Sequence, residues 1–443
     1  MTNISELTSS TAALSEKIKN KTAVVGVVGL GYVGLPLMVE KAKVGFKVIG
    51  IDQNPVRVDK VNRGENFIGD VKDAELKELA EKGSISAFTD FSIVPEMDVV
   101  VIAVPTPLTK NLTPDLSYVV SVTEGIAPYL RPGQLISLES TTYPGTTEEV
   151  MLPILERTGL KVEEDFYLCH SPERVDPGNL RYTTKNTTKV VGGVGPKSLE
   201  VAHLFYRQTI ENIVPVSSAK AAELTKVFEN TFRAVNIALV NEMMLLCDRL
   251  DLNVWEVLDA AFTKPFGIMP FYPGPGVGGH CIPLDPHYLE WKAKEVNFST
   301  HFIALAGEIN RRMPEFVVEK SIRVLNRRKV ALSAATVLVL GASYKKDIDD
   351  ERESPSIEII KLLQHEGANV VYHDSYVPNL KSHGIDLASI QLTQEALAAA
   401  DLVLIATDHS NVDYNMVAKH SVAVLDTRNA TKQITDRGNI TLL

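Results

Sequence analysis

The sequence has few cysteines and no long apolar segment. Its 443 residues include three cysteines, Cys169, Cys247 and Cys281, an odd number that excludes a fully paired disulfide framework and suits a reducing compartment. No stretch reaches the ~20 consecutive apolar residues that a transmembrane helix requires, and residues 1–22 lack the apolar core of a signal peptide. We therefore expect a cytoplasmic protein that does not bind membranes.

The chain also lacks an excess of positive charge. Its formal net charge is -10 at pH 7, and an acidic protein repels nucleic-acid backbones and anionic lipids. Nucleic acid is therefore not an expected partner, and an anionic ligand must be met by locally placed Lys or Arg side chains or by helix N-termini. The 45% of hydrophobic and 23% of charged residues are typical of a globular protein, and the length predicts two or three domains.

β-Branched, apolar segments alternate with helical ones in the first and last thirds of the chain. Predicted buried strands lie at residues 22–29, 47–51, 99–104, 135–139, 336–341, 369–372, 401–406 and 422–425. Such alternation is typical of doubly wound parallel sheets. Asp52 closes the second strand of the first set, and Asp374 closes the corresponding strand of the second. Ser354 and Pro355 predict a capped helix start in the last third.

Between these regions, residues 220–251 contain neither Gly nor Pro and have apolar residues at helical spacing. They predict one helix of about 30 residues, roughly 45 Å long, of the kind that spans domains or forms a subunit interface. We expect an α/β protein with two Rossmann-like, doubly wound parallel-sheet domains joined by this helix. The expected segments are a polar tail or loose helix at 1–20, a first Rossmann domain at 21–198, a helical domain with the Cys281 loop at 199–330 and a second Rossmann-like domain at 331–443.

A glycine-rich turn follows the first predicted strand. The sequence there is Gly29, Leu30, Gly31, Tyr32, Val33 and Gly34, which matches GxGxxG, and Asp52 follows about 20 residues later. This context predicts a dinucleotide site, although the same glycines could form a turn in another α/β protein. Asp52 would bind the ribose hydroxyls and repel a 2′-phosphate, which favours NAD over NADP, while Arg57 nearby would weaken that preference.

The most unusual stretch is FYPGPGVGGHCIPLDP at residues 271–286. Its glycines and prolines predict a rigid loop that exposes backbone to a ligand and presents the thiol of Cys281. Cys169 and Cys247 lie among apolar residues and are expected in the core. From the loop alone, Cys281 could be a nucleophile that attacks an aldehyde or a residue that only completes a turn.

These features occur together with further motifs in a fixed order. The motifs are GLGYVGLP at 29–36, VPTP at 104–107, ESTTYPGTT at 139–147, SPER at 171–174, ELTKVFEN at 223–230, GGHCIPLDP at 278–286, YKKDIDDERESP at 344–355 and LDTRN at 425–429. By them the chain resembles the UDP-glucose/GDP-mannose dehydrogenase family from about residue 22 onward. The resemblance implies two Rossmann-like domains, a long helix that also forms a homodimer, and two successive oxidations by NAD at C6 of a nucleotide-linked sugar.

The resemblance also implies roles for individual residues. By motif, Cys281 is the nucleophile, Lys226 and Asp285 handle a proton or water, Asn230 lies one helical turn after Lys226 near the sugar C6 oxygen, Glu173 acts in thioester hydrolysis and Thr141 lies beside the catalytic water. Without the resemblance, Lys226 and Glu173 would be interpreted as ordinary solvated charges.

The remaining implied contacts are with the two ligands. Pro105, Thr106 and Arg352 would contact NAD. The UDP-sugar would contact Glu173, Arg174, Lys226, Asn230, Phe271, Tyr272, Gly278, Lys345 and Arg428. We expect no metal site.

The cysteine loop also bears on the sugar. UDP-glucose enzymes of this family commonly have Lys before the Asp, where this chain has Leu284. The loop and Tyr288–Ala293 resemble the branch that acts on UDP-N-acetylhexosamines, which implies UDP-N-acetylglucosamine, with UDP-N-acetylmannosamine or UDP-glucose as alternatives.

Rival classes are a two-electron β-hydroxyacid dehydrogenase, which needs neither Cys281 nor residues 335–443, and a nucleotide-sugar sensor without catalysis. The number of NADH formed per sugar, two, one or none, separates the three.

Overall fold

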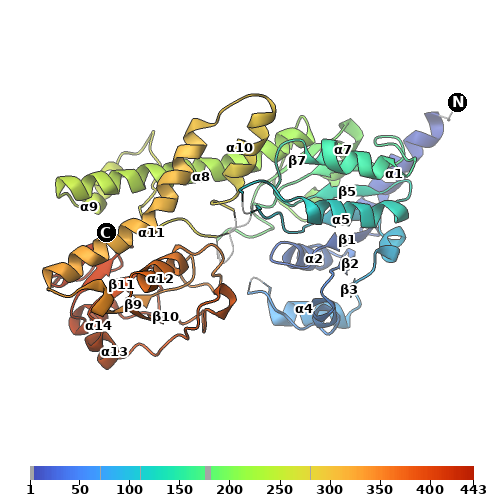
Figure 1. Ribbon diagram of the computed structural model, residues 1–443. Helices are drawn as coiled ribbons and strands as arrows, with labels where there is room; N and C mark the ends of the chain where they lie inside the picture. Colours follow the sequence, from blue (N-terminus) through green and yellow to red (C-terminus); the bar gives the residue numbers. More distant parts are fainter. Residues whose placement is uncertain (1–3, 70, 110, 175–180, 280) are drawn as a thin grey trace. The chain divides into compact units, whose positions relative to one another are not determined.

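The computed structural model describes residues 4–69, 71–109, 111–174, 181–279 and 281–443 (Figure 1). The chain forms two compact units. The N-terminal unit contains Met1–Glu229 and Trp291–Asn297, and the C-terminal unit contains Asn230–Glu290 and Phe298–Leu443.

An eight-stranded sheet forms the centre of the N-terminal unit. Its strands are β1 (Val24–Val28), β2 (Lys47–Ile51), β3 (Ile85–Phe88), β4 (Val99–Ile102), β5 (Leu135–Leu138), β6 (Tyr167–His170), β7 (Lys189–Gly193) and β8 (Ile213–Val216). Their order is β3-β2-β1-β4-β5-β6-β7-β8, with all neighbouring pairs parallel except β6 and β7. The first six strands therefore have the order of a doubly wound Rossmann fold, as predicted.

Helices cover both faces of this sheet. They are α1 (Ile4–Asn20), α2 (Gly34–Lys43), α3 (Pro55–Asn62), α4 (Asp73–Glu81), α5 (Ser117–Ile126), α6 (Leu152–Glu156) and α7 (Pro196–Arg207). Alternate strand residues point to opposite faces, so Val27 packs in a core with α1, α2 and α7, and Val28 packs in a core with α5 and α6. Both faces of the sheet are apolar for this reason.

Two segments differ from the sequence-based expectation. The N-terminal segment is a packed helix rather than a tail: α1 buries Leu14 and Ile18, and the Thr11 hydroxyl lies 2.6 Å from the Tyr167 hydroxyl. The first sheet also extends beyond residue 198, because β8 pairs with β7. A proline-containing strand as short as Ile213–Val216 gives a weak sequence signal, and the short strands β3, β7 and β13 were missed with it.

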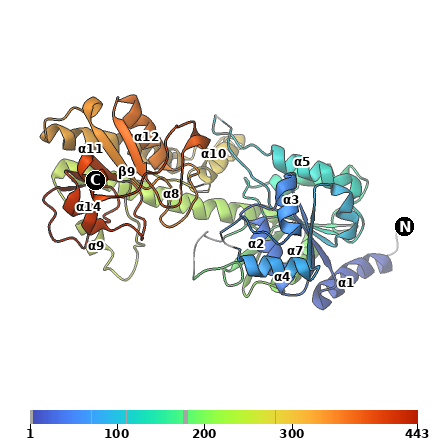
Figure 2. The ribbon, with the colours of Figure 1, turned by 90° about the horizontal axis from the view of Figure 1, so that it is seen from below.

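The predicted long helix is α8, Ala219–Leu250, 32 residues without interruption. It begins in the N-terminal unit and ends in the C-terminal unit, and it is the yellow-green helix of Figure 2. Its apolar side chains do not all face a core. Val227 and Ala238 are buried, but Leu224, Phe228 and Leu239 are exposed, so α8 has a second apolar face that neither unit covers.

A five-stranded parallel sheet forms the C-terminal unit together with helices. The strands are β9 (Thr336–Leu340), β10 (Asn369–His373), β11 (Leu402–Ile405), β12 (Val424–Asp426) and β13 (Ile440–Leu442), in the order β10-β9-β11-β12-β13. The helices are α9 (Val254–Ala261), α10 (Asp285–Glu295), α11 (His301–Arg327), α12 (Pro355–His365), α13 (Gln394–Ala399) and α14 (Tyr414–His420). Short 3₁₀ or π turns of the whole chain lie at Phe91–Glu96, Ala127–Tyr129, Thr146–Met151, Leu332–Ala334 and Lys381–His383.

The central helices belong to the core of the C-terminal unit. The second half of α8, with α9, α11 and α12, packs on one face of the β9–β13 sheet, and α13 and α14 pack on the other. Helix α12 begins as predicted, with the Ser354 side chain accepting from Ser356 N and Pro355 in the first position. Within the part of the chain that the structure describes, no helix combines the length and apolarity needed to cross a membrane.

Asp374 is the most heavily bonded carboxylate of the second sheet. Its Oδ2 accepts from the backbone N–H groups of Ala342 (2.7 Å) and Ser343 (3.0 Å) and lies 2.9 Å from His409 Nε2. Because His409 Nδ1 accepts from Asp347 N at 3.0 Å, the Nε2 atom carries the proton and donates to Asp374. Burial raises the pKa of Asp374, but the bonds from His409 and the backbone outweigh it and lower the pKa to about 2.

The Asp374→Asn substitution is expected to lower the stability of the C-terminal unit at pH 7 by about 2 kcal/mol, the value of a pKa difference of this size. A lowered native pKa stabilises the fold above the ordinary pKa near 4 and loses that contribution as the pH falls towards 2. Urea titrations at pH 7 and pH 3, read by hydrogen exchange of β9–β11 peptides, should show the larger loss at pH 7. Exposed Asp386→Asn is the control, and equal midpoints for both variants would contradict the prediction.

Candidate functional site

The turn between β1 and α2 requires its glycines for different reasons. Gly29 has φ +92°, and a Cβ there would lie 2.4 Å from the Ala103 carbonyl oxygen. A Cβ on Gly34 would lie 1.8 Å from the Gly29 carbonyl oxygen, so this residue permits the helix to approach the strand. A Cβ on Gly31 would meet nothing within 4 Å. The fold thus explains Gly29 and Gly34, whereas Gly31 borders open space, as close approach of a diphosphate requires.

Asp52 connects this turn to the end of β2. Its Oδ2 accepts from Leu30 N at 2.8 Å and lies 3.5 Å from Arg57 Nη1, while its Oδ1 accepts from Asn54 N at 2.8 Å. The structure therefore brings the glycine turn, Asp52 and Arg57 together. Helix α2 follows with Val33 as its N-cap, which has no side-chain acceptor, so no side chain caps the first turn. An uncapped helix start beside an open glycine suits an anionic diphosphate.

The loops after β4 and β5 are joined by hydroxyl groups. Thr106 Oγ1 donates to the Thr141 carbonyl oxygen at 2.7 Å, and Ser140 Oγ donates to the Val104 carbonyl oxygen at 2.8 Å. The loops that hold Pro105, Thr106 and Thr141 therefore lie together. The hydroxyl of the next residue, Thr142, is buried without a hydrogen-bond partner among the described atoms.

Glu223 on α8 fixes the loop that follows Thr141. Its carboxylate accepts from Gly145 N at 2.5 Å, from Thr147 N at 2.8 Å and from Thr147 Oγ1 at 2.6 Å. Burial raises the pKa of Glu223 to about 7, against the opposing effect of these donors. Lys226 follows one helical turn later and is also buried. Glu223 was not singled out from the sequence, although it stands within the ELTKVFEN motif.

Both charged residues of SPER are held by partners far along the chain. Glu173 Oε2 lies 3.2 Å from Lys189 Nζ at the start of β7. Arg174 makes a bidentate ion pair with Glu229 on α8, at 2.7 and 3.2 Å, and donates to the Thr188 carbonyl oxygen at 2.6 Å. Residues 175–180, directly after SPER, and His280 of GGHC lie outside the described residues.

In the C-terminal unit, Asn230, Cys281 and Asp285 lie together. Asn230 Nδ2 donates to Asp285 Oδ2 at 2.5 Å, and Asp285 N donates to the Cys281 carbonyl oxygen at 2.9 Å. Asp285 begins α10, so Cys281 occupies the turn directly before this helix. Its side chain is exposed, whereas Cys169 and Cys247 are buried in the two cores. The expected contrast between one presented thiol and two core thiols is confirmed.

The glycine–proline loop packs on the two basic motifs of the C-terminal unit. Gly279 N donates to the Arg352 carbonyl oxygen at 3.0 Å, and a Cβ on Gly278 would lie 2.5 Å from Tyr344 Cβ. A Cβ on Gly274 would lie 2.7 Å from Arg428 Nη1. A side chain at any of these glycines would push the loop away from YKKDIDDERESP or LDTRN.

The other predicted residues of this unit lie around the same loop. Arg428 Nε donates to the Ala406 carbonyl oxygen at 3.0 Å. Ser343 Oγ donates to the backbone carbonyl oxygen of Lys345 at 2.8 Å. Arg352 pairs with Asp350 at 2.6 Å. Tyr272 stacks on Trp255 and donates to Asp259 at 2.7 Å, while Phe271 packs against the core.

Asn241 on α8 was not singled out from the sequence, although it secures the loop. Its Oδ1 accepts from Gly274 N at 3.0 Å, and its Nδ2 donates to Asn310 at 2.9 Å.

The predicted site residues form one set in each unit. Thr141, Glu173 and Lys226 belong to the N-terminal unit, and Cys281 belongs to the C-terminal unit.

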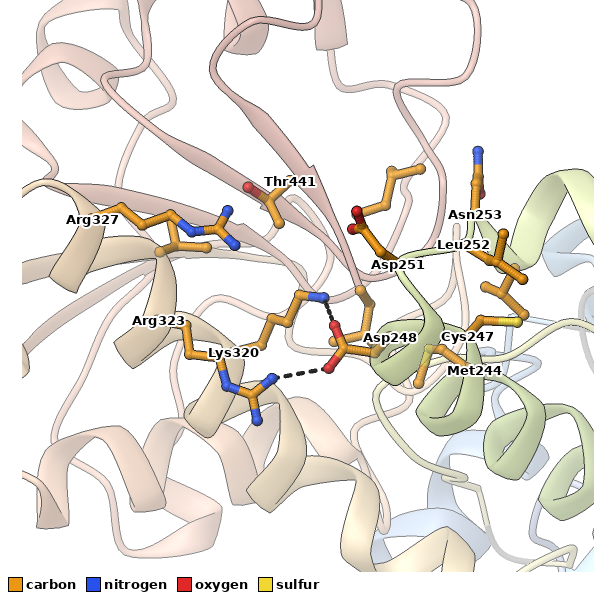
Figure 3. Close-up of a pocket in the computed structure, with 14 residues that line it drawn as sticks. Met244, Cys247, Asp248, Asp251, Leu252, Asn253, Lys320, Arg323, Arg327 and Thr441 are labelled. Carbon is orange, nitrogen blue, oxygen red and sulfur yellow. Dashed lines mark hydrogen bonds and ion pairs between the residues drawn. The ribbon is translucent and has the colours of Figure 1, made fainter.

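A separate cavity of about 460 Å³ lies where the end of α8 meets α11 and β13 (Figure 3). Asp248 lines it and pairs with Lys320 and with Arg323, the latter at 2.9 Å. None of the residues predicted to act on ligands lines this cavity. Its charges join α8 to α11 within the C-terminal unit.

Comparison with known proteins gives the same assignment along nearly the whole chain. Models of the UDP-glucose/GDP-mannose dehydrogenase family match in order: the NAD binding domain at residues 23–210, the central domain at 220–312 and the UDP binding domain at 338–433. The chain is 37% identical over 355 residues to UDP-N-acetyl-D-glucosamine 6-dehydrogenase of Pseudomonas aeruginosa. The aligned region covers 80% of this chain and 83% of that protein.

The similarity extends to other relatives and to their structures. UDP-N-acetyl-D-mannosamine dehydrogenase of Pyrococcus horikoshii is 34% identical over 416 residues, 92% of this chain and 96% of that protein. A solved UDP-N-acetyl-D-mannosamine dehydrogenase structure from Pyrococcus horikoshii superposes with a TM-score of 0.84 at 33% identity, covering 92% and 96% of the two chains. With its NAD-type glycine turn and UDP binding domain, the chain belongs to the UDP-glucose/GDP-mannose dehydrogenase family and is an NAD-dependent UDP-sugar dehydrogenase.

Proposed function

We propose that the protein oxidises the C6 alcohol of UDP-N-acetylglucosamine to the carboxylate in two NAD-dependent steps through a covalent bond to Cys281. The observation that carries this proposal is the cluster in the C-terminal unit, in which an exposed thiol precedes α10 and is followed by the Asp285–Asn230 pair. A presented thiol with a positioned carboxylate and amide suits covalent oxidation of an aldehyde. A two-electron dehydrogenase would need no such thiol.

The first step needs a hydride acceptor and a proton acceptor. NAD, when bound, accepts the hydride that leaves C6 in each oxidation. The hydroxyl proton passes to the Asp285 carboxylate, the basic member of the Lys226 and Asp285 pair, and the Lys226 ammonium stabilises negative charge that develops on the C6 oxygen. Asn230 extends from the same face of α8 as Lys226, four residues later, and donates a hydrogen bond towards that oxygen.

The second step uses the thiol. The Cys281 thiolate attacks the aldehyde carbon, which forms a C–S bond and a thiohemiacetal, and loss of the second hydride gives a thioester. Water then attacks the thioester carbonyl, Glu173 accepts a proton from it, the C–S bond breaks and the carboxylate leaves. Thr141 orients this water.

The ligands are bound by the two sets of residues already described. Asp52 binds the adenosine ribose, the Gly29–Gly34 turn binds the diphosphate, and Pro105, Thr106 and Arg352 complete the NAD contacts. Lys345 and Arg428 bind the UDP moiety, with Arg174, Phe271, Tyr272 and Gly278 beside the sugar. Open space at Gly31 and the uncapped start of α2 support the assignment of NAD to the first Rossmann unit.

The choice of sugar rests on the cysteine loop and on the relatives. Leu284 replaces a Lys that is common in UDP-glucose enzymes, and an apolar residue suits an acetamido group better than a hydroxyl. The relative at 37% identity is named for UDP-N-acetyl-D-glucosamine, and one at 34% for UDP-N-acetyl-D-mannosamine. UDP-N-acetylmannosamine is therefore the second candidate, followed by UDP-glucose.

We also propose that the protein is a cytoplasmic homodimer that pairs through α8. Leu224, Phe228 and Phe232 are exposed at four-residue spacing and form an apolar stripe on this helix. Leu239 and Leu246 are exposed further along the same helix. A monomer gains nothing from such a stripe, whereas a second copy would bury it.

A panel of UDP-sugars with NAD tests the proposed activity. UDP-N-acetylglucosamine should give the highest kcat/KM, and two NADH should form per sugar consumed, measured by absorbance against product analysis. One NADH per sugar would assign the protein to two-electron chemistry, and none would indicate a sensor. A preference for UDP-N-acetylmannosamine of more than about tenfold, ~1.4 kcal/mol, would transfer the assignment to that epimer.

The Cys281→Ser variant tests the covalent mechanism. It should still bind NAD and UDP-sugar, but formation of the acid should fall by several orders of magnitude, because a serine hydroxyl is a far poorer nucleophile than a partly ionised thiol. Intact-mass analysis during turnover should find no sugar adduct. Glu173→Gln is the counterpart, because slow hydrolysis should leave a sugar adduct on Cys281. A serine variant that forms the acid at a near-normal rate would refute the mechanism.

Asp52 should determine the choice of dinucleotide. The wild-type enzyme is expected to prefer NAD over NADP at least about tenfold in kcat/KM, ~1.4 kcal/mol. Asp52→Asn should reduce this ratio, because the amide still accepts from Leu30 N but no longer repels a 2′-phosphate. Asp374→Asn, which changes the corresponding position of the second sheet, should leave the ratio unaltered. Equal use of both cofactors by the wild type would remove Asp52 from the ribose site.

A further inference from the structure

Lys189 is a buried cation at the start of an otherwise apolar strand. It opens β7, KVVGG, and its side chain is 3% exposed. The ammonium group contacts three acceptors: Glu139 Oε2 at 3.0 Å, Glu173 Oε2 at 3.2 Å and the Pro172 carbonyl oxygen at 3.4 Å. An ammonium has three N–H donors, so each acceptor matches one of them.

Glu139 anchors this ammonium from the opposite side. It follows β5 and is fully buried, with Oε1 accepting from the Tyr206 hydroxyl at 2.7 Å. The Tyr206 hydroxyl lies 2.7 Å from Ser137 Oγ. Burial lowers the pKa of Lys189, but the charges of Glu139 and Glu173 outweigh it and raise the pKa above its ordinary value. Lys189 is therefore a cation at neutral pH.

Packing alone does not explain these charges. Burying an ion pair in a protein core is often no more favourable than burying apolar residues of similar volume, and β7 is otherwise apolar. The member of the cluster that reaches solvent is Glu173, whose side chain is 16% exposed. Its second oxygen, Oε1, accepts from Arg174 N at 2.8 Å. Each oxygen of the Glu173 carboxylate thus accepts from a different donor. Oε1 accepts from Arg174 N, and Oε2 accepts from the buried Lys189 ammonium.

We propose that Lys189 is a positioning residue for thioester hydrolysis, which holds the Glu173 carboxylate in place and is itself anchored by Glu139. This inference rests on the proposed role of Glu173. Water attacks the thioester carbonyl carbon, its proton moves to Glu173, and the C–S bond breaks to return the thiolate of Cys281. Lys189 exchanges no proton in this step. It holds the Glu173 carboxylate in one orientation, so its loss affects hydrolysis and leaves both oxidations intact.

The Lys189→Met variant separates these steps. Both oxidations precede hydrolysis, so mixing the variant with UDP-sugar and NAD should give a burst of two NADH per active site. A steady state slower by roughly 10²-fold, the effect of misplacing a reacting group by about 1 Å, should follow. Intact-mass analysis during the steady state should find the sugar adduct on Cys281. Glu173→Gln should show the same burst and adduct, and adding Lys189→Met to it should slow hydrolysis no further.

Lys41→Met is the matched control. Lys41 is also fully buried in this core, where burial lowers its pKa to about 7, but its Nζ donates to the Phe205 carbonyl oxygen at 3.4 Å and lies over the Phe205 ring. Its loss should produce neither burst nor adduct. If Lys189→Met fails to fold, Glu139→Gln/Lys189→Met removes both buried charges together, and this protein should show the same burst, because Glu173 still lacks its cation.

The outcomes separate this inference from the proposed function. A burst and an adduct in Glu173→Gln but in neither Lys189 variant would overturn the role of Lys189 and leave that of Glu173 intact. Uniformly slow turnover without a burst in the Lys189 variants would have the same meaning, since a general packing defect slows oxidation as well. Absence of a burst in Glu173→Gln would overturn the hydrolytic role of Glu173 and, with it, this inference.

Discussion

Both sheets are covered on both faces by helices, and this constraint decides where polar chemistry can occur. Side chains along the strands are mostly buried in apolar cores, so within each sheet the residues after the carboxyl ends of the strands are the ones available to a ligand. In the N-terminal unit, Asp52 follows β2, Thr106 and Thr141 lie in the loops after β4 and β5, and Glu173 follows β6. In the C-terminal unit, Arg428 follows β12. Parallel strands place all such ends at one edge of each sheet.

Polar groups at these edges are themselves partly buried, and each needs a partner of matching charge or hydrogen-bonding capacity. Asp285 is bound by Asn230, Glu223 by the N–H groups of the loop after β5, and Glu139 by Lys189 and Tyr206. An unpaired buried charge costs several kcal/mol. These bonds therefore hold the loops in one arrangement before any ligand binds, which is what a precisely oriented reaction requires.

The two sheets also show how equivalent positions diverge. Asp52 and Asp374 both follow the second strand of a doubly wound sheet, and both accept from the turn after the first strand. Asp374 additionally accepts a hydrogen bond from the side chain of His409, at 2.9 Å. Asp52 instead pairs with Arg57, whose Nη1 lies 3.5 Å from Asp52 Oδ2. The repeated fold therefore supports one dinucleotide site and leaves the second sheet for the UDP-sugar.

Features that depend on neighbours in the chain could be predicted from the sequence. Eight strands, the uninterrupted α8, the Ser354 cap and the turn at Gly29–Gly34 follow from periodicity, capping and glycine geometry, each encoded within a few residues. Charge partners could not be predicted in this way. Lys189 and Glu139 are separated by 50 residues in the sequence, and Arg174 and Glu229 by 55 residues. Glu223 and Gly145 are separated by 78 residues. Alone, each of these charged side chains is indistinguishable from a solvated one, because its burial and its partner arise only when distant strands and α8 pack together. Motifs in the sequence thus determined the family and its NAD-dependent UDP-sugar dehydrogenase activity, whereas tertiary packing decided which charged side chains are buried and which partners they have.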